Sequence, residues 1–396
     1  MKKTNRKALL LAAKIAAAAG LLAWVLSGVH WHDYVRARRG GKTYTVIAPP
    51  AEADGPQTIR VREGTLWWAR EQTRATAEFE PPPSGTGIIR PGFLTSLVGL
   101  NVPLAVLASM GFGASMVLIA IRWWLLLRIQ DIRIGRWEAI KLTFLGQFFH
   151  AVVPGTVGGD LVKAYYVARQ THKKAAALVS IFVDRLMGLA ELALMAGGML
   201  LVVLAGGLER FDDVRLPAVC LAIILLAVAG LLTFLLSRRF RRAFRLEKLY
   251  QRLPIAHHIA AAGVAAELYR RRLGTLAKTV LISFVSHLAF VGFIALTGTS
   301  LSLQTPWYRY FVYIPLIYII GAIPLTPGGV GWVENWYVRF FESPLCGASA
   351  ILVLAMLARL VPLLWGLPGA VVAVTGTRPP QAESMQAELA DGGADG

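Results

Sequence analysis

The chain is organised around the stretch Phe149-His150-Ala151-Val152-Val153-Pro154-Gly155-Thr156-Val157-Gly158-Gly159-Asp160-Leu161-Val162-Lys163, in which a proline, three glycines and two opposite charges interrupt an apolar run. A second interruption of the same kind lies in the other half, at Ile323-Pro324-Leu325-Thr326-Pro327-Gly328-Gly329-Val330-Gly331-Trp332-Val333-Glu334. Pro327 follows Pro154 by 173 residues. Two interrupted hydrophobic segments at corresponding positions of two halves indicate a transporter binding site.

The composition indicates a membrane protein. Of 396 residues, 56% are hydrophobic and 16% are charged, and the mean hydropathy is +0.55. We predict an all-α polytopic membrane protein with about six full spans and two broken or re-entrant helices. The paired breaks suggest an inverted repeat. The net charge of +18 suits cytoplasmic loops that face anionic lipid. No nucleic-acid-binding module is recognisable, so we expect no nucleic acid partner.

Four regions follow from the distribution of polar and apolar residues. Residues 1–29 begin with four basic residues and continue as an apolar run, which predicts an anchor helix with a cytoplasmic N-terminus; a cleaved signal peptide is the alternative. Residues 30–92 are polar and contain the alternating pieces 42–47 and 57–62, which predict a small extracytoplasmic insert such as a β-hairpin. Residues 93–376 form the transmembrane domain, and residues 377–396 are predicted to be a disordered tail.

Charge sets the expected orientation in the membrane. Residues 238–278 contain eleven Lys and Arg but only two Glu, so this loop is predicted to lie in the cytoplasm. The first break then lies between two cytoplasmic stretches, whereas the second follows an outward span. We therefore expect the two breaks to enter from opposite faces of the cell inner (cytoplasmic) membrane and to converge on one polar cavity.

The first break has the chemistry of an anion site. Proline and glycine at membrane depth free backbone groups that hydrocarbon cannot satisfy, so the loop is expected inside the protein. A half-helix that restarts at Gly158 has unpaired N–H groups and a positive dipole end, which suit a lipid phosphate. Asp160 fits a helix N-cap, and Lys163 can pair with Asp160 or contact a phosphate. The substrate-binding candidates here are Pro154, Gly155, Gly158, Gly159, Asp160 and Lys163.

The second break repeats these features. Its alternative interpretation is a kink whose backbone groups are satisfied by neighbours. Glu334 needs a partner in the membrane, and Arg359 or Arg185 are the candidates. The substrate-binding candidates here are Pro327, Gly328, Gly329, Gly331 and Glu334.

Further ionisable residues lie within predicted spans. We add Asp184, Arg185 and Arg359 to the substrate-binding candidates. Asp184 can also simply pair with a cation from another helix. Glu191 follows Asp184 by seven residues and so lies on the same helical face. His287 fits either a hydrogen-bonded packing histidine or a proton relay.

Two arginines near the end of the apolar run 93–127 have a simpler interpretation. Arg122 and Arg128 lie at its predicted cytoplasmic end. Long basic side chains at such positions reach the membrane interface and keep their charge in water. We therefore expect both arginines to snorkel.

Five motifs together resemble one family. They are residues 122–127 (RWWLLL), 144–149 (FLGQFF), 154–165 (PGTVGGDLVKAY), 184–188 (DRLMG) and 324–334 (PLTPGGVGWVE). In this order they resemble the flippase-like family named after the transmembrane region of lysylphosphatidylglycerol synthase, over residues 94–375. The resemblance implies a membrane domain that moves, or helps to move, modified phospholipids or other lipid-linked substrates between leaflets. Lys163 stands where much of the family has arginine, and no soluble aminoacyl-transferase domain is recognisable.

Three functions are compared. The leading hypothesis is a translocase for a membrane lipid with an anionic head group, without covalent chemistry and without catalytic residues, metal or cofactor; no P-loop is present. The alternative is a membrane-embedded transferase acting on a lipid or polyprenyl phosphate, with Asp160, Asp184 or Glu191 as metal ligand or general base. The third is a non-catalytic protein that recruits a partner enzyme. The lipid, the energy source and the oligomeric state stay open.

Overall fold

The structure is a computed structural model, and it divides into two compact units, each described by itself. Unit 1 comprises Met1–Ala108, Ile294–Tyr310 and Leu325–Leu360, and unit 2 comprises Ser109–Phe293, Phe311–Pro324 and Val361–Gly396. The predicted anchor helix, basic loop and tail fall wholly or mostly outside the residues that the structure describes. The described residues are 16, 20, 23, 26, 29–38, 42–48, 58–63, 70–81, 88–152, 158–169, 171, 174–236, 272–323, 325–343 and 345–375.

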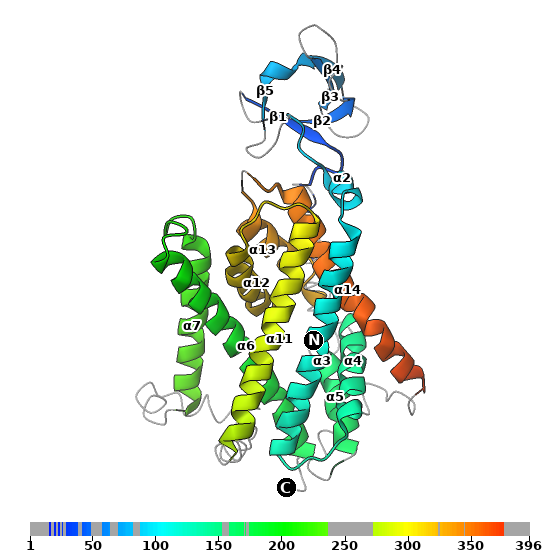
Figure 1. The fold of residues 1–396 in the computed structure, drawn as a ribbon, viewed down its shortest axis with the longest axis vertical. Coiled ribbons are helices and arrows are strands. Elements are labelled where there is room, and N and C mark those ends of the chain that lie inside the picture. The colour runs from blue at the N-terminus through cyan, green and yellow to red at the C-terminus, as the bar shows by residue number, and fades with distance from the viewer. Residues whose placement is uncertain are drawn as a thin grey trace, which may run out of the picture. The chain divides into compact units, whose positions relative to one another are not determined.

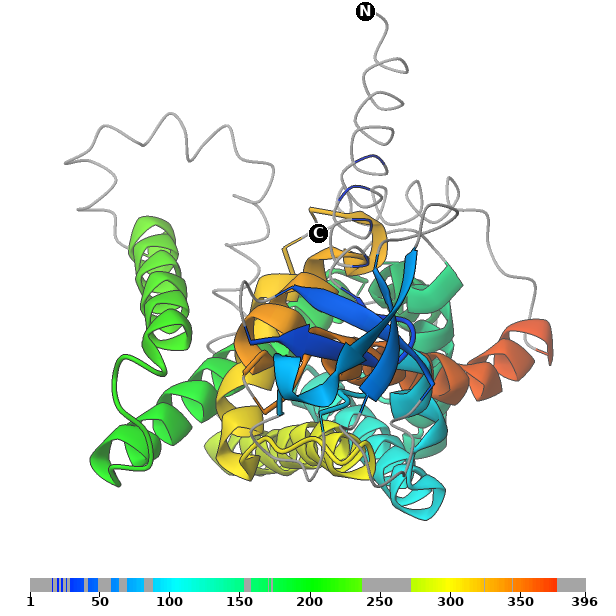
Figure 2. The same ribbon diagram turned by 90° about the horizontal axis from the view of Figure 1, so that it is seen from above.

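Unit 1 contains a five-stranded antiparallel sheet with the strand order β4-β3-β2-β1-β5 (Figures 1 and 2). In β3, Ile59 and Val61 are buried while Arg60 and Arg62 are exposed, as alternation along a half-buried strand requires. The insert therefore holds more than the hairpin that we expected. The strands are β1 Tyr34–Ala37, β2 Thr43–Ala48, β3 Thr58–Glu63, β4 Arg70–Ala75 and β5 Phe79–Glu80.

The sheet is joined to the first helix of the transmembrane region by hydrogen bonds at its base. Tyr34 exchanges two backbone hydrogen bonds with Arg90, and Asp33 Oδ1 accepts a hydrogen bond from the Gly92 N–H at 2.8 Å. On the exposed face, Glu71 accepts hydrogen bonds from Arg62 and Arg60. The hydrogen bond from Arg62 lowers the pKa of Glu71.

Helices make up the rest of the described chain, and their ends follow local sequence signals. Asn101 Oδ1 accepts a hydrogen bond from the Leu104 N–H and caps α3, whose second residue is Pro103. The helices are α2 Phe93–Val98, α3 Val102–Ile129, α4 Arg136–Val152, α5 Gly158–Arg169, α6 Lys174–Ala205, α7 Arg215–Leu236, α11 Leu273–Ser300, α12 Trp307–Gly321, α13 Trp332–Phe341 and α14 Ala348–Thr375, with the short 3₁₀ turn η3 at Pro327–Gly329.

Four helices in the described ranges are long and apolar enough to cross a membrane. They are Val102–Ile129, Ser180–Ala205, Leu273–Ser300 and Ala348–Val374, and a shorter apolar helix covers Arg215–Gly230. Many of their large apolar side chains are exposed, for example Leu194, Ile223 and Val371, as lipid-facing side chains are. The chain is thus a helical membrane protein. The expected total of about six spans stays a prediction.

One succession of helices occurs twice in the chain. A long helix, two short helices flanking a break and a second long helix form α3-α4-α5-α6, and the same order recurs as α11-α12-α13-α14. Helices α3 and α11 each have 28 residues. The first two helices of each set begin 171 residues apart, and the last two begin 174 residues apart. The spacing that was visible between the two breaks therefore extends over four helices.

Within unit 2, the first helices of the two sets run antiparallel. Phe112 of α3 packs against Phe293 of α11, with ring centroids 5.3 Å apart. Toward the other end of α3, the Arg128 carbonyl oxygen accepts a hydrogen bond from Arg272, directly before α11. Positions thus rise along α3 as they fall along α11.

The first break is a tight helical hairpin. Helices α4 and α5 pack side by side (Figure 1), and Gly146 of α4 faces Gly159 of α5. A Cβ atom on Gly159 would overlap the carbonyl group of Gly146, so this approach depends on the absence of a side chain.

We predict that Gly159→Ala destabilises the protein, because overpacking of this kind typically costs about 1–3 kcal/mol. The measurement is thermal unfolding of the purified protein in detergent. Gly198→Ala is the control: a Cβ on this helical glycine meets nothing within 4 Å, so helix propensity should raise stability by up to about 1 kcal/mol. A Gly159→Ala protein that unfolds at or above the wild-type temperature contradicts the hairpin packing.

Candidate functional site

At the first break, a buried carboxylate holds an accessible arginine. Arg185 of α6 donates from Nε to Asp160 Oδ2 of α5 at 2.6 Å. The Asp160 side chain is 10% exposed, whereas that of Arg185 is 53% exposed. Arg185 Nη2 lies 3.0 Å from His150 Nε2, and because arginine has no acceptor, this histidine nitrogen must accept. The hairpin and α6 thus fix one guanidinium at an accessible position.

Two expectations about the first break are corrected. Asp160 is the third residue of α5, inside its first turn, and not the N-cap, because the helix already begins at Gly158. Lys163 does not pair with Asp160; within the described part of the chain its Nζ lies over the Trp123 ring, 5.4 Å from the ring centroid. Its side chain is buried and its stem packs beside Gly146.

A second set of polar side chains extends from the same helix into unit 2. Arg122 of α3 donates to Asp184 Oδ1 at 2.8 Å and to Ser283 Oγ of α11 at 2.6 Å. The Ser283 hydroxyl in turn donates to Glu191 Oε2. His287 Nδ1 donates to the Ser283 carbonyl oxygen at 2.9 Å and lies 3.3 Å from Glu191 Oε2. These buried groups form a continuous chain across three helices.

This chain changes the interpretation of Arg122. The expectation that Arg122 snorkels is wrong, because its side chain is 6% exposed and paired inside unit 2. Asp184, in contrast, does pair with a cation from another helix, as one interpretation proposed. Asp184 and Glu191 lie on one face of α6, as their spacing predicted.

The second break, in unit 1, is closed by an ion pair of its own. Glu334 Oε2 accepts a hydrogen bond from the Gly331 N–H at 2.8 Å, and Oε1 lies 2.7 Å from Arg359 Nη2. Arg359 also donates from Nη1 to the Gly328 carbonyl oxygen at 2.8 Å. The structure therefore confirms Arg359, and not Arg185, as the partner of Glu334.

Glycine is required in the loop that this ion pair closes. The φ angles of Gly328, Gly329 and Gly331 are 61°, 68° and 76°, in the region that favours glycine. Pro327 is the first residue of the 3₁₀ turn η3. The loop conformation thus depends on residue types that the sequence had marked as candidates.

The two ion pairs correspond in every respect that the chain allows. Asp160 and Glu334 are the third residues of α5 and α13, and Arg185 and Arg359 are the twelfth residues of α6 and α14. In each pair the partners are 25 residues apart. In each, the carboxylate is buried and the arginine accessible, with the Arg359 side chain 39% exposed.

The remaining candidates divide into three groups. Pro154 and Gly155 lie outside the described residues, and Gly158 and Gly159 begin α5. Arg122, Ser283 and His150 were not among the candidates, since a single basic or polar residue near a span end gives no sign of its partner. The expectation that the two breaks converge on one cavity stays a prediction.

The acidic residues do not gather in the way that the transferase hypothesis needs. Asp160, Asp184 and Glu334 each pair with an arginine. Among the described residues, no group of three His, Cys, Asp or Glu is placed to hold a metal ion.

The fold and these pairs define a helical membrane domain with two helix breaks, each holding a charged pair. The family model of the lysylphosphatidylglycerol synthase TM region matches residues 91–369. The chain therefore belongs to this family and is a multi-pass membrane protein related to lipid handling. Neither a curated protein nor a solved structure matches it.

We predict that Asp184→Ala destabilises the protein by about 3–5 kcal/mol, because it leaves the buried Arg122 charge without a partner. The double variant Arg122→Met with Asp184→Leu should recover most of this loss, since it removes both charges. Thermal or denaturant unfolding in detergent measures both.

The control for Asp184→Ala is the exposed pair of Lys141 and Glu138, whose charged atoms lie 2.9 Å apart. Glu138→Ala should change stability by less than about 1 kcal/mol. If Asp184→Ala has no larger effect than Glu138→Ala, the buried pair does not stabilise the fold as described.

Proposed function

We propose that this protein translocates, or assists the translocation of, a phospholipid or lipid-linked substrate between membrane leaflets. Arg185 and Arg359 would contact its phosphate group. The observation that carries the proposal is the repeated pair: in each copy of the helix set, a buried carboxylate positions an accessible arginine at a helix break.

An arginine held in this way keeps hydrogen-bonding capacity for a ligand. A guanidinium has five N–H donors in a planar fork that matches phosphate oxygens. Arg185 directs its Nε and Nη2 groups to Asp160 and His150, and its Nη1 group carries two further donors. The nearby carboxylate also offsets part of the positive charge. Such a site favours a phosphate that binds and leaves again, as translocation requires.

The ends of the short helices support the same chemistry. Helices α5 and α13 begin at Gly158 and Trp332, next to their respective ion pairs. The first N–H groups of a helix lack intrahelical partners and carry a partial positive charge. A phosphate near either arginine would therefore also meet favourable backbone dipoles, while its acyl chains remain in lipid.

We further propose that the two helix sets form an inverted repeat in an inner membrane, with the N-terminus in the cytoplasm. Support comes from the equal lengths and antiparallel course of α3 and α11. The basic sequence after residue 236 supports the orientation. An inverted repeat would give each leaflet its own break and arginine, which is the arrangement that alternating access uses.

The test is transbilayer movement of a fluorescent phospholipid in proteoliposomes, followed by dithionite quenching. We expect Arg185→Gln and Arg359→Gln each to slow movement about 10- to 100-fold, because hydrogen bonds to charged groups contribute about 1.5–3 kcal/mol. Arg185→Lys should fall between wild type and Arg185→Gln, since lysine keeps the charge but loses bidentate geometry.

Arg215→Gln is the matched control, because Arg215 is an exposed arginine at the start of α7. Its rate should equal that of wild type. Chromatography of the lipid after the assay separates translocation from transfer. Wild-type rates in both arginine variants, or a chemically changed lipid, contradict the proposal.

A further inference from the structure

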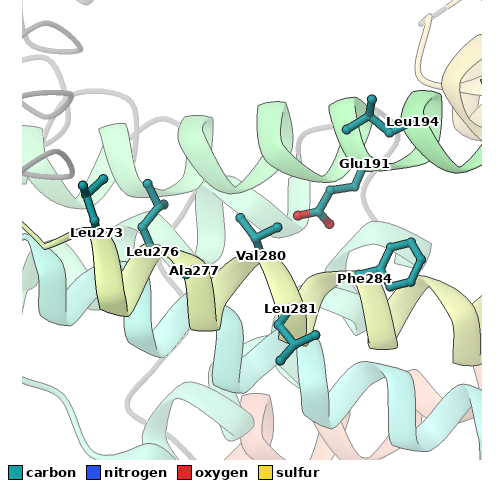
Figure 3. Close-up of a pocket in the computed structure, with 8 residues that line it drawn as sticks. All are labelled: Glu191, Leu194, Leu273, Leu276, Ala277, Val280, Leu281 and Phe284. Carbon is teal, nitrogen blue, oxygen red and sulfur yellow. The ribbon is translucent and has the colours of Figure 1, made fainter.

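A groove between α6 and α11 in unit 2 differs from both ion-pair sites. It has a volume of about 700 Å³, within the usual range of ligand pockets. All of its lining side chains are apolar except one, Glu191, which points from α6 toward α11 (Figure 3). The lining residues are Glu191, Leu194, Leu273, Leu276, Ala277, Val280, Leu281 and Phe284.

Glu191 has one oxygen atom without a partner. Its Oε2 contacts Ser283 and His287, but Oε1 is buried and accepts no hydrogen bond from any described residue. The side chain is 8% exposed. An unsatisfied buried acceptor is costly, and most such atoms in native structures have a partner. The carboxylate can turn about its soft terminal torsion and present this oxygen to the groove.

The repeat shows that the fold does not itself require this acid. At the corresponding positions of the second helix set, Trp365 stands for Glu191 and Ala358 for Asp184. Phe293 stands for Arg122, and Phe112 takes the place of Ser283. The same helical framework is thus built with apolar residues in the other copy. The polar chain ending at Glu191 is specific to the first copy.

We infer that this groove holds the apolar chain of a lipid that carries a hydroxyl group, and that the hydroxyl donates a hydrogen bond to Glu191 Oε1. The inference rests on the proposed function, because it names a feature of the lipid that the protein handles. It adds a chain-binding groove and a hydroxyl contact to the phosphate contacts at Arg185 and Arg359.

The number of hydrogen-bonding groups favours a hydroxyl over an ammonium group. A hydroxyl has one donor, and the site offers one free acceptor oxygen. An ammonium group has three donors and a charge whose burial costs several kcal/mol unless all are satisfied. The remaining lining residues, from Leu194 to Phe284, offer no side-chain acceptor.

The experiment uses the full chain in phosphatidylcholine nanodiscs with three photoactivatable probes that share the same acyl chains: a diacylglycerol, its methyl ether and its amine analogue. Crosslinking to α6 and α11 is measured against probe content. We expect the alcohol to label at about 10-fold lower content than the ether, as one hydrogen bond to a charged group predicts. Glu191→Leu should remove this difference. Glu191→Gln should keep it, because the amide oxygen still accepts.

Two further variants test the groove itself. Ala277→Phe fills it and should weaken labelling by both alcohol and ether. Ile223→Phe changes an exposed apolar residue of α7 and should leave labelling unchanged. Equal labelling by alcohol and ether in wild type overturns the hydroxyl contact, and so does preferential labelling by the amine that Glu191→Gln abolishes. Unchanged labelling in Ala277→Phe overturns the groove as the chain site.

This result is separable from that of the translocation assay. Crosslinking reports binding at equilibrium and does not involve Arg185 or Arg359. Loss of the alcohol preference with normal translocation would overturn this inference alone, whereas an intact preference with wild-type rates in both arginine variants would overturn the proposed function alone.

Discussion

A buried carboxylate that holds an arginine at a helix break is the interaction on which this structure depends. Breaks within apolar helices free backbone groups, and a charge placed there needs a partner. Glu334 meets both needs, because one oxygen accepts the Gly331 N–H and the other binds Arg359, which in turn donates to a freed carbonyl group. At the first break, Asp160 ties the hairpin to α6 through Arg185. Structure and proposed chemistry thus rest on the same pairs.

The two helix sets share these pairs but differ elsewhere. Only the first set adds the buried chain from Arg122 to Glu191. The second set fills the corresponding positions with large or small apolar residues, such as Trp365 and Ala358. Trp365 instead packs against Gly113 and donates a hydrogen bond to Ser109. We interpret the shared pairs as the common part of the mechanism and the additional chain as the source of lipid selectivity.

The sequence predicts the helical class and the positions of the breaks, because long apolar runs and Pro-Gly clusters are local signals. Residue 359 was also predictable as a partner of Glu334, being the only charge in its span. Arg122 was not, since a span end predicts snorkelling equally well and burial depends on packing against α6 and α11. The sheet was underestimated because β1 and β5, with four and two residues, are too short to show alternation.

The central claim, that matched arginines face opposite sides of the membrane, is tested most directly by thiol labelling from each side. Arg185→Cys and Arg359→Cys would be made separately in a chain whose Cys220 and Cys346 are replaced by alanine. A membrane-impermeant maleimide is then applied to sealed vesicles of each orientation. The account predicts labelling of position 185 from the cytoplasmic side and of position 359 from the outer side. Labelling of both positions from the same side contradicts it.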